Sequence, residues 1–255
     1  MTRSGRSTRD QVERVHGMAA VLAVLARRPD DVLRIQHTKA ARLPLAEALR
    51  EAARRRIAYN EVSDEELAEL SGAAHHEGVC ALIRPRPAPT LETLVRRATP
   101  TGLVLALDGV DNPHNVGAVL RSVAFFGAAG LLVADATRKA LPPSAVRIAE
   151  GGAEHAPVVH VPALAPALRV LRERGLTIVG TDSHDGIPLA ALHWPARCVL
   201  VLGAERAGMT QDVRASCELV TCIEGSGAIE SLNVAVAAGV LLAAHALARA
   251  PRPAR

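Results

Sequence analysis

Between residues 102 and 223, short apolar stretches alternate with segments of helical periodicity, and this alternation constrains the fold most strongly. Each apolar stretch is hydrophobic along most of its length, so both faces of a strand formed there must be buried. Strands of this kind separated by helices predict an α/β fold with a mainly parallel sheet covered on both faces. The expected strands are Leu103–Asp108, Gly130–Ala134, Val158–Val161, Thr177–Thr181, Val199–Gly203 and Leu219–Ile223. Ligands of such sheets bind outside the carboxyl ends of the strands.

A second alternating pattern precedes this one and predicts a small α/β domain over residues 12–84. Helices are expected at His16–Arg27, Leu45–Arg55 and Asp64–Leu70, and strands at Val32–His37, Ile57–Val62 and Val79–Ile83. The polar, arginine-rich residues 1–11 are expected to form a disordered tail. Prolines interrupt any regular period in residues 85–101, which are therefore interpreted as a linker before a second domain over residues 102–250.

Composition favours a polyanionic partner only weakly. The formal charge is +4 and the sequence pI is about 9.2, a mild basic excess of the kind that nucleic-acid-binding proteins show. The arginines fall in local clusters that solvated surfaces and tails explain equally well. Two Phe, one Tyr and one Trp are few for a protein that would bind single-stranded bases mainly by stacking them on aromatic rings.

Cysteine spacing and hydropathy indicate a reduced, cytoplasmic protein. The four cysteines show no zinc-binding spacing, so we expect free thiols and no metal. The amino terminus lacks the apolar core of a signal peptide. The longest apolar stretch, Val234–Ala248, is interrupted by Gly239 and His245 and is too short to span a bilayer, so no membrane association is expected.

The loop after the first strand of the second domain carries two unusual polar residues. A turn-rich sequence, DGVDNPHN, follows Asp108, and a helix is expected to begin near Asn115. Asn115 is explained equally well as the N-cap of that helix. Arg121 lies inside an apolar helical stretch, so its guanidinium must either leave the core or meet an anion.

Two later strands also run into polar loops. The strand ending at Gly203 continues into GxExxG, which contains Glu205 and Gly208, although an ordinary turn would account for these glycines as well. The strand ending at Ile223 leads through a glycine-containing loop to a long apolar helix. Ser231 is a suitable N-cap for that helix, and Asn233 is an amide in its first turn that requires hydrogen-bond partners.

Taken together, these motifs resemble those of one family. NxGxxxR, LGxExxG and SLNVAVA occur in the order found in SpoU (TrmH-like) RNA methyltransferases, and AEGGAEHAPV at 149–158 resembles a further stretch of that family. Residues 12–86, with VHGMAAVLAVL and HHEGV, are similar to the ribosomal-protein-like substrate-binding domain that often precedes the catalytic one. The resemblance covers nearly the whole chain except its tails.

The resemblance implies an α/β-knot fold, in which a trefoil knot would involve the loops at 203–208 and 223–232. It implies S-adenosylmethionine as cofactor, held by Gly203, Ile223 and Leu232, without a metal. It also implies methylation of RNA, tRNA or rRNA, at a ribose 2′-hydroxyl by a homodimer. The apolar final helix either contributes to the dimer interface or belongs to the core of its own domain. Arg121 would activate the hydroxyl, and the residues that would position the reactants are Asn115, Glu205, Ser231 and Asn233.

One departure from the family keeps a second function open. Many relatives have Ile-Pro-Met where this chain has Ile223-Glu224-Gly225, so a carboxylate stands beside the expected donor pocket. The alternative is a knotted RNA-binding protein without methyltransferase activity, acting in RNA or ribosome maturation. A doubly wound oxidoreductase is disfavoured because no glycine fingerprint follows the first strand. His75 and His76 beside Glu77 are interpreted as a turn rather than a metal site.

Overall fold

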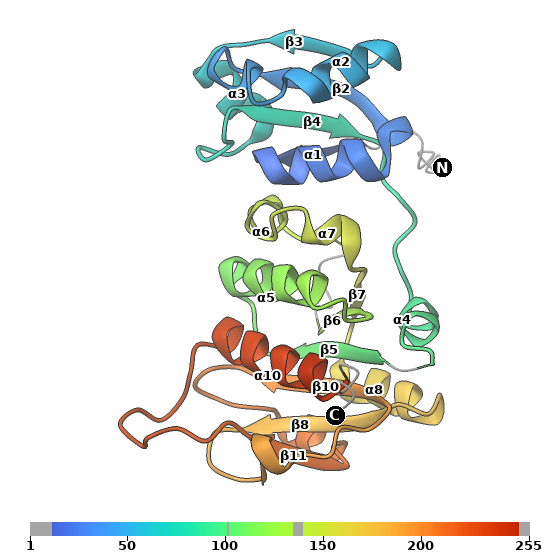
Figure 1. Cartoon of the computed structure of the whole chain (residues 1–255), viewed down its shortest axis with the longest axis vertical. Coiled ribbons are helices and arrows are strands. Elements are labelled where there is room, and N and C mark those ends of the chain that lie inside the picture. The colour runs from blue at the N-terminus through green and yellow to red at the C-terminus, as the bar shows by residue number, and fades with distance from the viewer. Residues whose placement is uncertain (1–11, 101, 135–139, 250–255) are drawn as a thin grey trace, which may run out of the picture. The chain divides into compact units, whose positions relative to one another are not determined.

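The computed structural model describes residues 12–100, 102–134 and 140–249 (Figure 1). By its contacts the chain divides into two compact units. The first consists of Met1–Pro87 together with Val146–Glu154, and the second of Ala88–Ala145 together with His155–Arg255. No helix among the described residues combines the length and the apolar character needed to cross a membrane.

The first unit is a four-stranded sheet in the order β1-β4-β2-β3. Its strands are β1 (Glu13–His16), β2 (Val32–His37), β3 (Ala58–Glu61) and β4 (Val79–Ile83), and its helices are α1 (Met18–Arg27), α2 (Ala46–Arg54) and α3 (Asp64–Ser71). Strand β4 runs antiparallel to β1 and β2, whereas β2 and β3 are parallel. One face of the sheet packs its apolar side chains, including Ile35 and Ala81, against Val21 of α1 and Ala52 of α2.

Strand β1 was not predicted, because His16 was assigned to the following helix. Residues Glu13–His16 instead pair with β4, and Gly17 adopts φ 98° between this strand and α1. A positive φ is accessible to glycine without strain, so Gly17 lets the chain turn sharply from strand to helix. The other predicted strands and helices of residues 12–84 are present with boundaries shifted by two residues or fewer.

The second unit contains a seven-stranded parallel sheet in the order β7-β6-β5-β10-β8-β11-β9. The strands are β5 (Gly102–Asp108), β6 (Gly130–Ala134), β7 (Val158–Val161), β8 (Thr177–Asp182), β9 (Ile187–Pro188), β10 (Arg197–Gly203) and β11 (Leu219–Cys222). All six predicted strands are present, and only the two-residue edge strand β9 was missed. The predicted α/β class with a mainly parallel sheet is confirmed.

Helices cover both faces of this sheet. On one face, α4 (Leu91–Arg97), α8 (Leu164–Glu173) and α9 (Gln211–Ala215) share a core with Val104 and Ala106 of β5. The alternate residues of β5, Leu103, Leu105 and Leu107, point to the opposite face and are also buried. On that side α5 (Pro113–Phe125) and α10 (Val234–Arg249) pack against each other, and α10 contacts β10 (Figure 1).

Helix α4 corrects the expectation of an irregular linker at residues 85–101. Thr90 and Thr93 form a capping box that satisfies backbone groups at the start of the helix. Leu94 and Ala98 are completely buried in the core of the second unit. The prolines therefore lie on either side of a short helix that folds with the second unit. The helix was not predicted because its seven residues are too few to establish a helical period of apolar residues.

The segment Val146–Glu154 is held in the first unit by charged groups. It contains the second half of α6 (Pro143–Ile148) and the first three residues of α7 (Gly152–His155). Arg28 Nη2 lies 2.6 Å from Glu154 Oε1, and each of the two side chains is only 9 % exposed. Arg147 Nη1 lies 3.2 Å from Glu77 Oε1. Because unpairing a buried charge is costly, the Arg28–Glu154 pair anchors this segment firmly.

Helix α10 contains one buried histidine. His245 is 9 % exposed, and its ring meets that of Trp194 edge to face, with the ring centroids 5.1 Å apart. Burial, together with the nearby Arg249, lowers the pKa of His245 from 6.5 to about 4. The imidazole is therefore neutral in the folded protein across the physiological range.

This histidine makes stability pH-dependent. As the pH falls from 6.5 towards 4, the unfolded chain takes up a proton at position 245 that the folded chain excludes, so the free energy of unfolding decreases. Between about pH 7 and about pH 5 this group should cost about 2 kcal/mol. Urea unfolding of His245→Phe, which keeps a ring against Trp194, should lack this component. His193→Gln, which changes an exposed histidine, should retain it, and equal slopes in both variants would contradict the prediction.

Candidate active site

Four neighbouring strands of the second unit end at one edge of the sheet. In the order β5-β10-β8-β11 their carboxyl ends are Asp108, Gly203, Asp182 and Cys222. Parallel strands bring the loops that follow them to the same edge, so the three polar loops of the sequence analysis meet there.

Asp108 ties two of these loops together. Its side chain is buried, and Oδ2 accepts hydrogen bonds from Thr210 N at 2.6 Å and from Thr210 Oγ1 at 2.9 Å. Thr210 follows the GxExxG loop, so the end of β5 is fixed against the chain leaving that loop. The Asp108–Thr210 pair was not predicted, although an aspartate at the end of an otherwise apolar strand is a visible signal.

The loop after β10 is tight and requires glycine at its start. Ala204 and Gly208 form a two-way backbone bridge, with N···O distances of 3.1 and 2.8 Å. A Cβ atom on Gly203 would overlap the returning backbone of Gly208 and Met209. The first glycine of GxExxG is thus required by the close approach of the chain, and the closed loop presents Glu205 towards α5 and α10.

Glu205, Asn115 and Asn233 form a hydrogen-bonded trio. Glu205 Oε1 accepts from Asn115 Nδ2 at 3.1 Å and from Asn233 Nδ2 at 2.7 Å, and Asn115 Oδ1 accepts from Asn233 Nδ2 at 3.1 Å. The backbone N–H of Val234 also donates to Glu205 Oε1, at 3.3 Å. Three residues that are far apart in the sequence, one from each motif, are therefore in direct contact.

The N-caps of α5 and α10, the helices that carry Asn115 and follow Asn233, differ from those expected. Helix α5 begins at Pro113, and its N-cap is Asn112, whose side chain accepts from His114 N at 2.9 Å. Asn115 therefore lies within the first turn and is free to bind Glu205. In α10 the cap is Asn233, whose Oδ1 accepts from Ala235 N at 3.0 Å and from Val236 N at 3.4 Å. Ser231 is not the N-cap, because the helix begins at Val234.

Two of the predicted positioning and catalytic residues lie outside the trio. Arg121 lies on α5 six residues beyond Asn115, a rise of about 9 Å along the helix axis, and its side chain is exposed. It has thus left the core, as one of the two expectations for it required. Ser231 is exposed in the segment that leads to Asn233.

The expected donor-binding residues lie on the loops of the same edge. Gly203 ends β10, Ile223 follows β11, and Leu232 precedes Asn233. Ile223 is partly exposed, and the side chain of Leu232 is 39 % exposed. The two apolar side chains are therefore accessible, and Leu232 is the sequence neighbour of Asn233 in the trio. The knot predicted for these loops stays a prediction.

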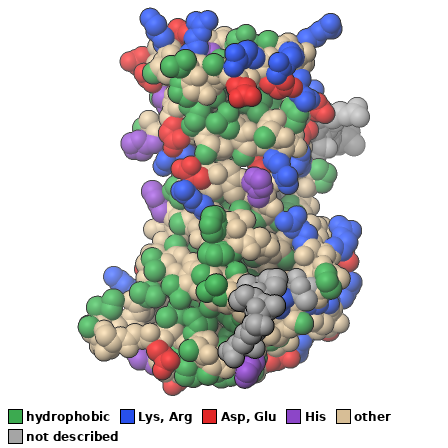
Figure 2. Space-filling model, in the orientation of Figure 1, with side chains coloured by type: hydrophobic (Ala, Val, Ile, Leu, Met, Phe, Trp, Pro, Cys, Tyr) green, Lys and Arg blue, Asp and Glu red, His purple; other side chains and the backbone are tan. Residues whose placement is uncertain are grey.

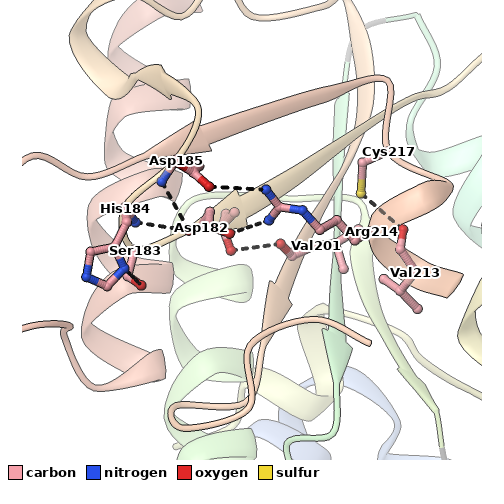
Figure 3. A network of polar contacts seen from close by, with 9 residues as sticks. Asp182, Ser183, His184, Asp185, Val201, Val213, Arg214 and Cys217 are labelled. Atoms are coloured by element: carbon pink, nitrogen blue, oxygen red, sulfur yellow. Dashed lines mark hydrogen bonds and ion pairs between the residues drawn. The ribbon is translucent and has the colours of Figure 1, made fainter. Parts of the chain in front are cut away.

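Asp182, at the end of β8, forms a second polar network at this edge (Figure 3). It accepts from the backbone N–H groups of His184 and Asp185 at 3.0 and 3.1 Å and pairs with Arg214 of α9. Burial favours a raised pKa for Asp182, but the hydrogen bonds from these three residues outweigh it and lower the pKa. Arg214 thus fixes the loop after β8, which lies between the loops after β10 and β11.

Three of the four cysteines are unsuited to act as nucleophiles. All four are free thiols, as expected. Burial raises the pKa of Cys80 and Cys217 to about 11 and that of Cys198 to about 12, so these three thiols remain protonated at neutral pH. The interpretation of His75–Glu77 as a turn agrees with the structure, in which His76 is buried and accepts from Gly78 N at 3.1 Å.

Comparison with known proteins identifies the motifs of this edge. The model of the SpoU rRNA Methylase family matches residues 102–243, which contain the trio and all the predicted site residues. The chain belongs to this family. Residues 14–89 match the model of the RNA 2′-O ribose methyltransferase substrate binding domain. The membership expected from the three motifs is confirmed.

Relatives of the SpoU family resemble this chain along most of its length. An uncharacterized tRNA/rRNA methyltransferase, YfiF, of Escherichia coli O157:H7 is 40 % identical over 93 % of this chain and 68 % of its own. The 23S rRNA (guanosine-2′-O-)-methyltransferase RlmB of Pseudomonas aeruginosa is 36 % identical over 91 % of this chain and 95 % of its own. Among solved structures, the SpoU methyltransferase AviRb of Streptomyces viridochromogenes in complex with AdoMet superposes with a TM-score of 0.77. It is 25 % identical over 95 % of this chain and 92 % of its own.

The trio predicts that a carboxylate at position 233 destabilises the protein only while position 205 also carries a carboxylate. Asn233→Asp keeps an oxygen that can cap α10 but places a carboxylate against Glu205, so it should destabilise the protein by about 1–2 kcal/mol near pH 7. Adding Glu205→Gln restores an amide–carboxylate pair and should recover most of this loss. The free energy of urea unfolding of the two single variants and the double variant provides the measurement. If the double variant were no more stable than Asn233→Asp, the hydrogen bond between positions 205 and 233 would not stabilise the fold.

Proposed function

We propose that this SpoU-family protein transfers a methyl group from S-adenosylmethionine to a ribose 2′-hydroxyl of RNA, either rRNA or tRNA. The observation that carries the proposal is the hydrogen-bonded trio Asn115–Glu205–Asn233, which joins the three family motifs at the carboxyl edge of the sheet. The RlmB relatives are named as 2′-O-methyltransferases of guanosine in 23S rRNA, which supports ribosomal RNA as the first substrate to test. The expected cytoplasmic location remains a prediction.

The residues at this edge fit the methyl donor. Ile223 and Leu232 offer accessible apolar side chains for the adenosyl group, and Gly203 is a partly exposed backbone position at the end of β10. Strands β10 and β11 are separated by β8 alone, so the loops that carry Gly203 and Ile223 are about 10 Å apart, a distance that suits a nucleoside. When bound, the donor supplies an electrophilic methyl group on a cationic sulfur.

The remaining residues serve the acceptor. In the reaction the ribose oxygen forms a bond to the methyl carbon, the carbon–sulfur bond breaks with its electron pair going to sulfur, and the hydroxyl proton leaves to solvent or an RNA phosphate. Arg121, exposed on α5, polarises the hydroxyl and holds the adjoining phosphate. Asn115, Glu205 and Asn233 act as a rigid block that positions the ribose and the donor, because each one restrains the other two. Ser231 lies next to Leu232 and contacts the acceptor.

One observation favours a second candidate, an RNA-binding protein without methyltransferase activity. Glu224 and Gly225 replace a proline and a methionine of many relatives, and both are exposed directly after Ile223. A carboxylate and a glycine there would weaken an apolar donor pocket. Titration calorimetry with S-adenosylmethionine distinguishes the two, because the methyltransferase requires stoichiometric binding and the second candidate requires none.

We also propose a homodimer formed through α10. Val236, Val240 and Leu247 are exposed on the side of α10 opposite its buried residues, and Leu247 is 76 % exposed. Phe125, at the end of the neighbouring helix α5, is 82 % exposed. Figure 2 shows hydrophobic side chains gathered over these two helices. An apolar surface of this kind is typical of a contact between identical subunits.

The function is tested by transfer of labelled methyl groups from S-adenosylmethionine to RNA from a strain that lacks this gene. Nucleoside mass spectrometry should then find a labelled 2′-O-methylnucleoside. Labelled base methylation would contradict the ribose as acceptor. Absence of both incorporation and donor binding would favour the RNA-binding protein without activity.

Replacing Arg121 separates chemistry from folding. Because Arg121 is exposed, Arg121→Ala should leave the thermal unfolding temperature and donor affinity nearly unchanged while lowering the methyl-transfer rate by at least about a hundredfold. The matched control is Arg169→Ala, which removes an exposed arginine of α8 on the other side of the sheet and should retain full activity. Equal rates in the two variants would remove Arg121 from the mechanism.

The dimer is tested by placing a charge in the apolar surface of α10. Val240→Glu would bury an unpaired carboxylate in the contact and should weaken dimerisation at least about tenfold. Val170→Glu alters an exposed valine of α8 and should leave the dimer intact. Sedimentation equilibrium measures both variants, and a monomeric wild-type protein would contradict the proposed dimer directly.

A further inference from the structure

A strip of the sheet in the first unit carries arginines on an open face. The strand register places Arg14 of β1 and Arg34 of β2 on either side of Leu82 of β4, and Ala58 of β3 beside Arg34. Side chains of directly paired residues point to the same face of a sheet. These four residues therefore form one row across all four strands, which we call the arginine strip.

The arginine strip lies on the face opposite the main core of this unit. That core uses Val15, Ala81 and Ile35, which alternate with the strip residues along β1, β4 and β2. The next row on the strip's own face contains Cys80, which packs with Leu67 of α3. Helix α3 thus covers the neighbouring row, while Arg14, Arg34 and Ala58 remain exposed and Leu82 is partly exposed.

The two guanidinium groups of the strip are not neutralised by the described part of the protein. Neither side chain, of Arg14 or of Arg34, forms a hydrogen bond or an ion pair with a residue in the described ranges. Other arginines of this unit differ, since Arg42 pairs with Glu61 and Arg54 pairs with Glu51. Figure 2 shows that Lys and Arg side chains are frequent on the surface of this unit.

Spacing and chemistry fit a nucleic-acid backbone. Arg14 and Arg34 are two strand spacings apart, about 10 Å, and arginine forms bidentate hydrogen bonds with phosphate. The apolar Leu82 between them and the small Ala58 beside them leave a flat surface on which a ribose or a base can lie. A row of cations without anionic partners on a flat, partly apolar surface is complementary to a polyanion with sugar and base faces.

We propose that the arginine strip binds the RNA backbone, with Arg14 and Arg34 each contacting a phosphate. This proposal rests on the proposed function, because it assigns to specific residues the contact by which the RNA substrate is held. Its recognition is backbone-directed and therefore independent of sequence. Specificity for a particular nucleotide has to come from other residues.

The test is equilibrium binding of a fluorescein-labelled single-stranded RNA of mixed sequence to the full-length protein over a series of potassium chloride concentrations. Arg14→Ala/Arg34→Ala should bind roughly 10- to 100-fold more weakly at low salt. The slope of the logarithm of the binding constant against the logarithm of salt should decrease by about 1.4, since each phosphate contact with a single strand contributes about 0.7. Arg14→Lys/Arg34→Lys should keep most of the slope.

The matched control is Arg42→Ala/Arg54→Ala, which removes the same charge from the same unit but takes arginines that pair with glutamates away from the strip. It should change the affinity less than about twofold. Equal slopes for the strip variant and this control would overturn the proposal, as would a wild-type protein that binds no RNA.

The outcome is independent of catalysis, because binding is measured without methyl transfer. Donor binding by calorimetry and thermal unfolding of each variant report separately on the second unit and on folding. A protein that binds RNA through the strip but transfers no methyl group would refute the proposed function and leave the strip in place. If the protein methylates RNA but the strip variant leaves the salt dependence of RNA binding unchanged, the strip proposal would be refuted and the proposed function would stand.

Discussion

The hydrogen bonds accepted by Glu205 link the loops at the carboxyl edge of the parallel sheet. One carboxylate oxygen receives the amide of Asn115 from α5, the amide of Asn233 and the backbone N–H of Val234 at the start of α10. The loop that carries Glu205 is itself closed by the Ala204–Gly208 bridge and tied to β5 through Asp108 and Thr210. A single side chain thus links the loop after β10 to the starts of α5 and α10, and any ligand at this edge meets a preformed arrangement.

Asn233 both caps a helix and links two of the sequence motifs. Its oxygen caps α10, while its nitrogen donates to both Glu205 and Asn115. A flip that exchanged the amide oxygen and nitrogen would therefore lose both the helix cap and the hydrogen bonds to Glu205 and Asn115. Such a double constraint explains why an amide is suited to this position, since a carboxylate could cap the helix but could not donate, and an alcohol could not reach three partners.

The sequence predicted the strands of the parallel sheet well because a strand buried on both faces is apolar throughout, a signal that requires no tertiary information. It failed at short or marginal elements: β1 and β9 have four and two residues, and α4 lies among prolines. The candidate site residues were singled out through motifs, but their contacts were not predictable. Asn112 and Asn115 are both suitable N-caps for α5 by residue type, and so are Ser231 and Asn233 for α10. The backbone geometry decides between them, and the sequence does not show it. The Asp182–Arg214 pair, 32 residues apart, likewise has no local signal.

The segment Val146–Glu154 has a consequence for how this protein can be divided. The chain leaves the second unit after Ala145, contributes this segment to the first unit, and returns at His155. No single cut therefore separates the units. A fragment starting at Ala88 would retain Glu154 without Arg28 and Arg147 without Glu77, and would expose the surface of Gly151 that lies against Ala23 in the intact chain. A fragment cut at a single position therefore cannot isolate either unit intact and alone.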